Sequence, residues 1–238
     1  MEKGQLLYEG KAKRLYTTNE AGVLLVSYKD SATAFNGEKK ETITGKGELN
    51  NAITSTLFQE LHRVGISTHF IRKISSTEQL VREVSIIPLE VVVRKTVAGS
   101  LAKRLGLEEG MILNEPIVEF YYKDDSLGDP LVTTEHIRLL QLATPEELDV
   151  LKTDALTIFQ HMHDYFHSHH VRLVDFKLEF GRTSTGDILL ADEISPDTCR
   201  LWDETTNEKL DKDVFRRGLG NLTDAYQTIA DRIGGTIA

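Results

Sequence analysis

The chain of 238 residues contains a single cysteine, Cys199, and no long hydrophobic run. One cysteine cannot form an intrachain disulfide, which is typical of proteins in a reducing compartment. No apolar stretch approaches the roughly 20 residues that cross a bilayer, and the first residues lack the apolar core of a signal peptide. These absences predict a cytoplasmic protein that has no membrane partner.

Positive charge is also scarce. The chain has 28 Lys and Arg against 37 Asp and Glu, a formal net charge of −9. A general nucleic-acid binder needs a broad basic face, so nucleic acid is not expected as a partner. Small anionic ligands remain possible because they need only local positive charge.

Hydrophobic periodicity predicts an α+β fold. Short strands are expected at 6–8, 12–16, 23–28, 68–74, 79–84 and 89–97, and helices at 46–64, from Thr144 towards His167, and at 221–233. Pro88 is expected to interrupt strand pairing, and the chain to cross between lobes near residues 86–88. This predicts a β-rich N-terminal lobe over residues 1–86 and a mixed α/β C-terminal lobe over 87–238.

The most informative segment, residues 174–181, alternates charged and apolar side chains. As a strand it places Asp175, Lys177 and Glu179 on one face. A buried strand at 188–191 follows and ends in Asp192; a turn centred between residues 184 and 185 would place Asp192 opposite Lys177. A cation among carboxylates suits a magnesium-nucleotide site. The competing interpretation is a solvated face with cross-strand ion pairs.

Two other segments carry groups that suit anions. On a strand, Lys11 and Lys13 point the same way, although exposed lysines also protect sheet edges. Arg94 ends a buried strand before a helix that starts near Ser100, an arrangement that suits a phosphate. Alternatively, Ser100 caps its own helix and Arg94 pairs with a carboxylate.

The segment from Asp192 to Asp203 has too many polar groups beside an apolar strand for a purely structural loop, and we interpret it as functional. His163, His167 and His170 share a helix face, but the chain lacks the His-Glu-x-x-His pattern of zinc enzymes. A solvated helix end explains these histidines better.

These motifs together resemble the SAICAR synthetase family of purine biosynthesis. The resemblance is carried, in order, by Gly10-Lys11-Ala12-Lys13, Val93-Arg94 with Ala98-Gly99-Ser100-Leu101, Asp175-Phe176-Lys177-Leu178-Glu179-Phe180-Gly181, and Asp192-Glu193-Ile194-Ser195-Pro196-Asp197 with Arg200-Leu201-Trp202-Asp203. It implies a nucleotide site between two lobes, as in kinase and ATP-grasp folds, with the base near residues 81–87. It also implies an ATP-dependent ligase that joins L-aspartate to the carboxylate of 5-amino-1-(5-phosphoribosyl)imidazole-4-carboxylate (CAIR), with ATP and Mg²⁺ as cofactors and a homodimer as the assembly.

The resemblance also implies roles for individual residues. ATP phosphates would contact Lys11, Lys13 and Lys177; Mg²⁺ would be held by Glu179 and Asp192; the CAIR phosphate would be bound by Arg94, Ser100 and Arg200; the imidazole carboxylate or a second metal ion would be handled by Glu90 and Asp129; and Lys123 and Asp175 would line the site without an assigned role.

Two rival functions remain from the sequence. A small-molecule kinase would share the lysines and the metal carboxylates, and a non-catalytic nucleotide-binding module would need no metal carboxylates. The protein-kinase His-Arg-Asp pattern is missing from the chain.

Overall fold

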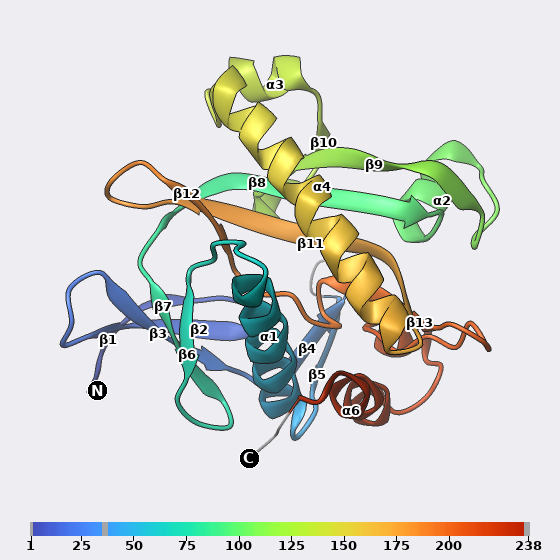
Figure 1. The fold of residues 1–238 in the computed structure, drawn as a ribbon, viewed down its shortest axis with the longest axis horizontal. Helices are drawn as coiled ribbons and strands as arrows, with labels where there is room; N and C mark the ends of the chain where they lie inside the picture. Colours follow the sequence, from blue (N-terminus) through green and yellow to red (C-terminus); the bar gives the residue numbers. More distant parts are fainter. Residues whose placement is uncertain (1, 35–37, 236–238) are drawn as a thin grey trace.

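The computed structural model describes residues 2–34 and 38–235 and confirms the α+β class and the two-lobe arrangement (Figure 1). The N-terminal lobe is a five-stranded antiparallel sheet in the order β1-β2-β3-β7-β6. Its strands are β1 (Lys3–Glu9), β2 (Lys13–Thr18), β3 (Val23–Tyr28), β6 (Phe70–Lys73) and β7 (Glu78–Arg82).

The second lobe contains a six-stranded antiparallel sheet in the order β10-β9-β8-β11-β12, with β13 also paired to β11. Its strands are β8 (Ser85–Thr96), β9 (Ile112–Tyr122), β10 (Leu131–Val132), β11 (Val171–Arg182), β12 (Ile188–Ala191) and β13 (Cys199–Asp203). A separate hairpin pairs β4 (Ser31–Ala34) with β5 (Lys39–Thr42).

Helices cover both sheets. They are α1 (Lys46–Arg63), α2 (Gly99–Leu105), α3 (Thr134–Leu139), α4 (Pro145–Ser168), α5 (Asp213–Arg217) and α6 (Leu222–Ile233), with a short 3₁₀ helix η2 (Asp125–Leu127). In Figure 1, α4 lies along the larger sheet, while α1 packs beside α6 and contacts the smaller sheet. No helix within the described ranges is long and apolar enough to span a bilayer.

The three long helices confirm the sequence prediction within a few residues. Helix α4 begins at a capping box, in which Thr144 Oγ1 accepts from the backbone N–H of Glu147 (3.2 Å) and Glu147 Oε2 accepts from that of Thr144 (2.8 Å). Helix α6 begins after Asn221, whose side chain accepts from the Thr223 N–H.

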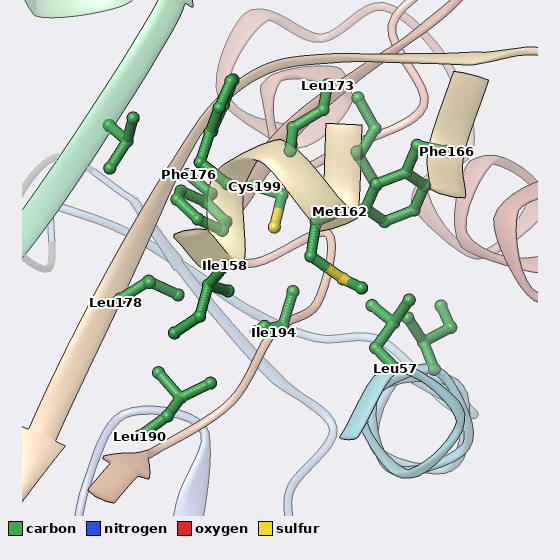
Figure 2. Packing of buried hydrophobic residues seen from close by; sticks show 14 of the residues in the cluster. Leu57, Ile158, Met162, Phe166, Leu173, Phe176, Leu178, Leu190, Ile194 and Cys199 are labelled. Atoms are coloured by element: carbon green, nitrogen blue, oxygen red, sulfur yellow. The ribbon is translucent and has the colours of Figure 1, made fainter. Parts of the chain in front are cut away.

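The apolar face of β11 anchors the core between the two long helices (Figure 2). Phe176 and Leu178 pack towards Ile158 and Met162 of α4, and Leu57 of α1 joins the same cluster. All five side chains are at most 1% exposed. Since side chains alternate along a strand, burial of this face directs Asp175, Lys177 and Glu179 to the opposite face, as predicted.

The register of the β11–β12 hairpin differs from the prediction by one residue. Glu179 pairs with Ala191, so Asp192 does not lie opposite Lys177 in the ladder. The loop has three residues, 184–186, closed by a bond from the Gly186 N–H to the Thr183 carbonyl (3.0 Å). Gly186 has φ +91°, which suits the left-handed position that such a loop requires.

Pro88 interrupts strand pairing, as predicted, but the strand continues through it. It lies within β8, where the pairing with β11 shifts register between Ile86 and Glu90, and a proline needs no ladder hydrogen bond at such a bulge. The chain crosses between the sheets at residues 83–84, earlier than expected. The division of the chain at 86/87 stays a prediction.

Five strands were not predicted: β4, β5, β9, β10 and β13. Strand β9 pairs with β8, and residues 199–203, interpreted from the sequence as part of a loop, form β13 beside β11. Strand β13 has only five residues, and β9, with eleven, contains a proline; both form strands because β8 and β11 offer edges with which they can pair.

Candidate functional site

Two cavities lie on the charged side of β11. One, of about 340 Å³, is largely apolar and is lined by β2, β3 and β7 together with Val84 and Ile86. The other, of about 450 Å³, is polar and is lined by β8 and β11 and by residues 197–200. Lys177 lines the polar cavity and Glu179 the apolar one, so that a single strand serves both.

The apolar cavity suits a nucleotide base. Leu15, Leu24, Val26 and Val81 form its walls, and its other end holds Lys13, Lys123, Glu179 and Asp192. A flat, apolar ring system can bury its faces here while phosphates extend towards the charged groups. The predicted base site, near residues 81–87, coincides with this cavity.

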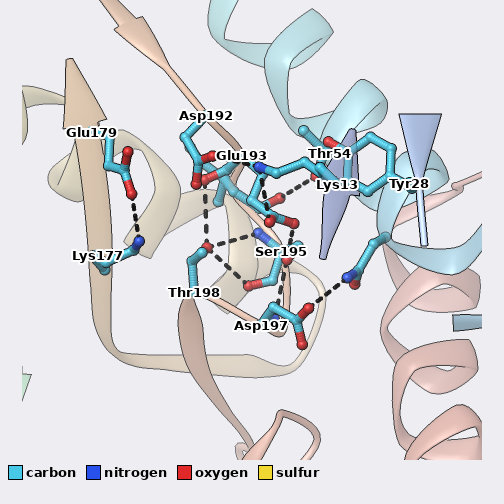
Figure 3. Close-up of polar contacts among 12 residues, drawn as sticks. Lys13, Tyr28, Thr54, Lys177, Glu179, Asp192, Glu193, Ser195, Asp197 and Thr198 are labelled. Atoms are coloured by element: carbon cyan, nitrogen blue, oxygen red, sulfur yellow. Dashed lines mark hydrogen bonds and ion pairs between the residues drawn. The ribbon is translucent and has the colours of Figure 1, made fainter. Parts of the chain in front are cut away.

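Lys13 joins the N-terminal sheet to the acidic loop after β12 (Figure 3). Its Nζ lies 2.5 Å from Asp192 Oδ1 and 3.0 Å from Glu193 Oε1. Burial alone would lower the pKa of Lys13, but these two carboxylates raise it above its usual value. Lys13 therefore stays charged, as a phosphate-binding lysine must.

Asp192 leaves β12 with a positive φ of 59°. An aspartate tolerates this left-handed conformation better than most residues, and the turn directs its carboxylate towards Lys13. Burial favours the neutral acid, yet Lys13, Lys177 and Lys123 lower the pKa of Asp192 below its usual value. Its Oδ2 accepts no hydrogen bond from any residue that the structure describes.

Glu179 is the second carboxylate beside the apolar cavity. Only 3% exposed, it accepts through Oε1 from Lys177 (2.6 Å) and Lys123 (2.9 Å). Within the described ranges, Oε2 has no partner. Lys177 also binds Glu90 at 3.0 Å; burial alone would lower the pKa of Lys177, but Glu179 and then Glu90 raise it above its usual value.

These carboxylates fit a magnesium ion that is shared with phosphate. Glu179 and Asp192 each keep one oxygen without a hydrogen bond, and hard oxygen donors are what Mg²⁺ binds. No group of three or more His, Cys, Asp or Glu among residues 2–34 and 38–235 is arranged to hold a metal. An ion here would need phosphate and water oxygens to complete its shell, as magnesium-nucleotide sites do.

The far end of the polar cavity is built around Asp175. Its carboxylate, 3% exposed, binds Arg94 Nη1 at 2.6 Å and Arg200 Nη1 at 2.9 Å. Arg94 also contacts Glu119 (2.8 Å) and donates to the Ser100 hydroxyl (3.1 Å). The predicted phosphate-binding residues Arg94, Ser100 and Arg200 are therefore brought together, with Asp175 fixing both guanidiniums.

Ser100 does not cap helix α2, which was the alternative interpretation from the sequence. The helix begins at Gly99, and its N-cap, Ala98, makes no side-chain hydrogen bond. The other part of that alternative holds, because Arg94 does pair with carboxylates. This pairing leaves Arg94 oriented towards the cavity that it lines.

The remaining predicted residues lie at the cavity margin. Lys11 pairs with Asp125 at 2.8 Å, and both side chains are largely exposed. Asp129 lines the polar cavity with φ +48°, and its Oδ1 accepts from the Asp124 N–H.

A buried cluster around Asp197 was missed by the sequence analysis. Its carboxylate accepts from Lys46 Nζ, from Asn50 Nδ2 (2.9 Å) and from the Tyr226 hydroxyl (2.7 Å), and Lys212 Nζ lies 3.7 Å away. Lys46 is fully buried at the start of α1. Helical periodicity placed residue 46 at a helix end, and gave no signal that its charge faces a partner 151 residues away.

Two of the histidines that share a face of α4 contact nearby carboxylates. His163 Nδ1 lies 3.2 Å from Asp164, and His167 Nδ1 lies 2.5 Å from Glu204.

Comparisons with known proteins show the family of the chain. A sequence model described as SAICAR synthetase matches residues 6–233. The phosphoribosylaminoimidazole-succinocarboxamide synthase of Bacillus cereus is 69% identical over 235 residues, covering 99% of this chain and 98% of the relative.

Solved structures give the same result. The phosphoribosylaminoimidazole-succinocarboxamide synthase of Ehrlichia chaffeensis superposes with a TM-score of 0.95 and 44% identity over 98% of this chain and 99% of that one. A SAICAR synthetase in complex with ADP superposes with a TM-score of 0.93 and 48% identity over 96% and 97% of the two chains. The chain therefore belongs to the SAICAR synthetase family and is an ATP-dependent ligase of purine biosynthesis, as its motifs predicted.

Proposed function

We propose that the two cavities hold MgATP and CAIR on opposite sides of Lys177, and that L-aspartate joins them in the polar cavity. The observation that carries this proposal is the spacing along β11. Asp175, Lys177 and Glu179 follow one another on one face, so about 13 Å of strand separates Asp175, which binds the arginine pair, from Glu179, which lines the nucleotide cavity. A phosphoribosyl imidazole carboxylate can bridge that span.

The chemistry requires activation of a carboxylate. An oxygen of the CAIR carboxylate attacks the γ-phosphorus of ATP, the bond to the β-phosphate oxygen breaks, and ADP leaves. The aspartate amine then attacks the acyl carbon, a C–N bond forms, and the C–O bond breaks to release phosphate as the amine loses a proton. Charge neutralisation and positioning are the main tasks of the protein.

Individual residues carry out this charge neutralisation and positioning. Lys13 and Lys177 contact ATP phosphates, with Lys11 at the cavity margin. Glu179 and Asp192 hold Mg²⁺, which when bound offsets phosphate charge. Arg94, Ser100 and Arg200 bind the CAIR phosphate, and Asp175 orients both arginines towards it.

The remaining groups adjust charge near the imidazole. Glu90 holds the Lys177 ammonium and faces the cavity, and Lys123 holds the carboxylate of Glu179. Asp129 is the second candidate for the imidazole carboxylate or for a second metal ion.

We also propose that the protein is cytoplasmic and forms a homodimer. The buried free thiol of Cys199 is consistent with a reducing compartment. The dimer rests on the family resemblance, and analytical ultracentrifugation of the purified chain would test it.

The decisive experiment measures ADP release with CAIR, with and without L-aspartate. Release that requires both substrates supports the ligase, whereas release that ignores aspartate indicates a kinase or an ATPase. Glu179→Ala and Asp192→Ala should each reduce the rate by at least about 100-fold and weaken the Mg²⁺ dependence of ADP binding. Exposed Asp149, changed to Ala, is the control. Unchanged activity in the two site variants would contradict the metal-binding roles proposed for Glu179 and Asp192.

A further inference from the structure

The polar cavity is strongly cationic for so acidic a protein. Its lining includes six basic side chains and four acidic ones, although the whole chain has a net charge of −9. The basic residues are Lys11, Arg94, Lys177, Arg200, Lys212 and Arg216, and the acidic ones are Glu90, Asp129, Asp175 and Asp197. A surplus of positive charge in a concave site attracts anionic ligands.

Four of these cations already have close carboxylate partners and proposed ligands. Lys11 pairs with Asp125, Lys177 with Glu90 and Glu179, and both Arg94 and Arg200 with Asp175. Lys212 and Arg216 are not among the residues proposed above to hold ATP or the CAIR phosphate. They stand four residues apart at helix α5, so their side chains lie on the same helix face.

Lys212 has spare hydrogen-bonding capacity. Its side chain is 14% exposed, and its Nζ donates no hydrogen bond to the part of the chain that the structure describes. Among the described residues, the carboxylate in ionic contact with it is that of Asp197 at 3.7 Å, which Lys212 shares with the buried ammonium of Lys46. Burial lowers the pKa of Lys212; Asp197 opposes this shift, but the nearby charges of Lys46 and Arg216 add to it, and the pKa stays below its usual value. An anion in the cavity would relieve both penalties.

The guanidinium of Arg216 uses only one of its three nitrogens for hydrogen bonds to the described residues. Its Nη1 contacts Asp213 Oδ1 at 2.6 Å, while Nε and Nη2 have no hydrogen-bond partner within residues 2–34 and 38–235. Asp213 also binds Arg200 at 3.1 Å, so that its charge is shared between two guanidiniums. Arg216 therefore keeps donors for a second carboxylate.

Lys212 lines the same cavity as Lys177, and a loop connects the two sides. The backbone N–H of Lys177 donates to the Thr198 carbonyl at 2.8 Å, and Thr198 follows Asp197 in the loop that faces Lys212. From these contacts we infer that Lys212 and Arg216 form the carboxylate-binding subsite for the amino-acid substrate. The inference rests on the proposed ligase function, in which a dicarboxylic amino acid must be held beside the activated acyl group.

The test is steady-state kinetics of Lys212→Gln with each substrate varied in turn. Loss of a charge-assisted hydrogen bond should raise the KM for L-aspartate by roughly 10- to 100-fold. The KM values for CAIR and ATP should stay within about twofold, because their proposed contacts are intact. Lys103→Gln, an exposed change on α2, is the matched control and should leave all three KM values unaltered.

Lys212 lies close to the buried cluster around Asp197, so its replacement can destabilise the fold. The melting temperature of each variant is therefore measured together with the kinetics. If Lys212→Gln does not fold, Lys212→Arg and Arg216→Gln decide the question, with a raised aspartate KM for Arg216→Gln as the supporting result. An unchanged aspartate KM, or an equal rise in the CAIR KM, would overturn the subsite. Wild-type enzyme that releases ADP without aspartate would instead refute the ligase proposal itself.

Discussion

Replacement of Asp175 by Asn tests the electrostatic design of the anion site. Asp175 is 3% exposed and pairs with Arg94 at 2.6 Å and with Arg200 at 2.9 Å. The amide has nearly the same shape as the carboxylate, so the substitution removes charge without opening a cavity. Two buried guanidiniums would then lose their shared counterion.

The loss of folding stability depends on which carboxylate partners each arginine retains. Breaking a buried ion pair costs about 3–5 kcal/mol. Arg94 retains Glu119 and Arg200 retains Asp213, so neither cation is left without a carboxylate. We therefore expect the lower end, about 3 kcal/mol, which corresponds to a melting temperature lower by about 6–12 °C for a chain of this size.

Differential scanning calorimetry of wild type, Asp175→Asn and the exposed control Asp149→Asn measures this effect. The control should change stability by no more than about 0.5 kcal/mol. CAIR, or inorganic phosphate at high concentration, should restore part of the lost stability, since an anion between the two arginines replaces the missing charge. If Asp175→Asn melts within about 1 °C of the control, the ion-pair reasoning is wrong.

Two other predictions concern buried titratable groups. Burial, followed by the charge of Lys13, lowers the pKa of His69 to about 4, and in the unfolded chain a histidine titrates near 6.5. The stability that His69 contributes is therefore present above pH 6.5 and declines as the pH falls towards 4, by roughly 2 kcal/mol at pH 5. Urea unfolding at pH 7 and pH 5 should show this decline in wild type and in the more exposed control His163→Asn, but a smaller one in His69→Asn; identical pH profiles would contradict it. Burial also raises the pKa of the Cys199 thiol, which is 3% exposed, so a thiol reagent should label the native protein only as fast as it unfolds. Rapid labelling of folded enzyme, with the rate of a free thiol, would refute that expectation.

Local sequence patterns were sufficient to predict the strand and the helix next to the site. The alternation along β11 predicted which face is buried, and the capping box at Thr144 predicted where α4 begins. These features depend on neighbours within a few residues, which a single sequence displays directly. The family motifs also named the residues that the fold gathers around the two cavities.

Longer-range relations could not be read in the same way. The register of the β11–β12 hairpin depended on a three-residue loop with Gly186 in the left-handed region, and a shift of one residue changes every cross-strand partner. Pro88 interrupts pairing as predicted, but the sequence did not show that β8 continues past it through a bulge. The strand at β13 exists because β11 offers it an edge.

By itself the sequence determined the α+β class, the long helices, the charged face of β11 and the family of the protein. Only the tertiary structure decided how those charges are shared, with Asp175 between two arginines and Asp197 among Lys46, Tyr226 and Lys212. The physical reason is that periodicity reports burial along one element, whereas a buried charge is satisfied by whichever distant groups packing brings near.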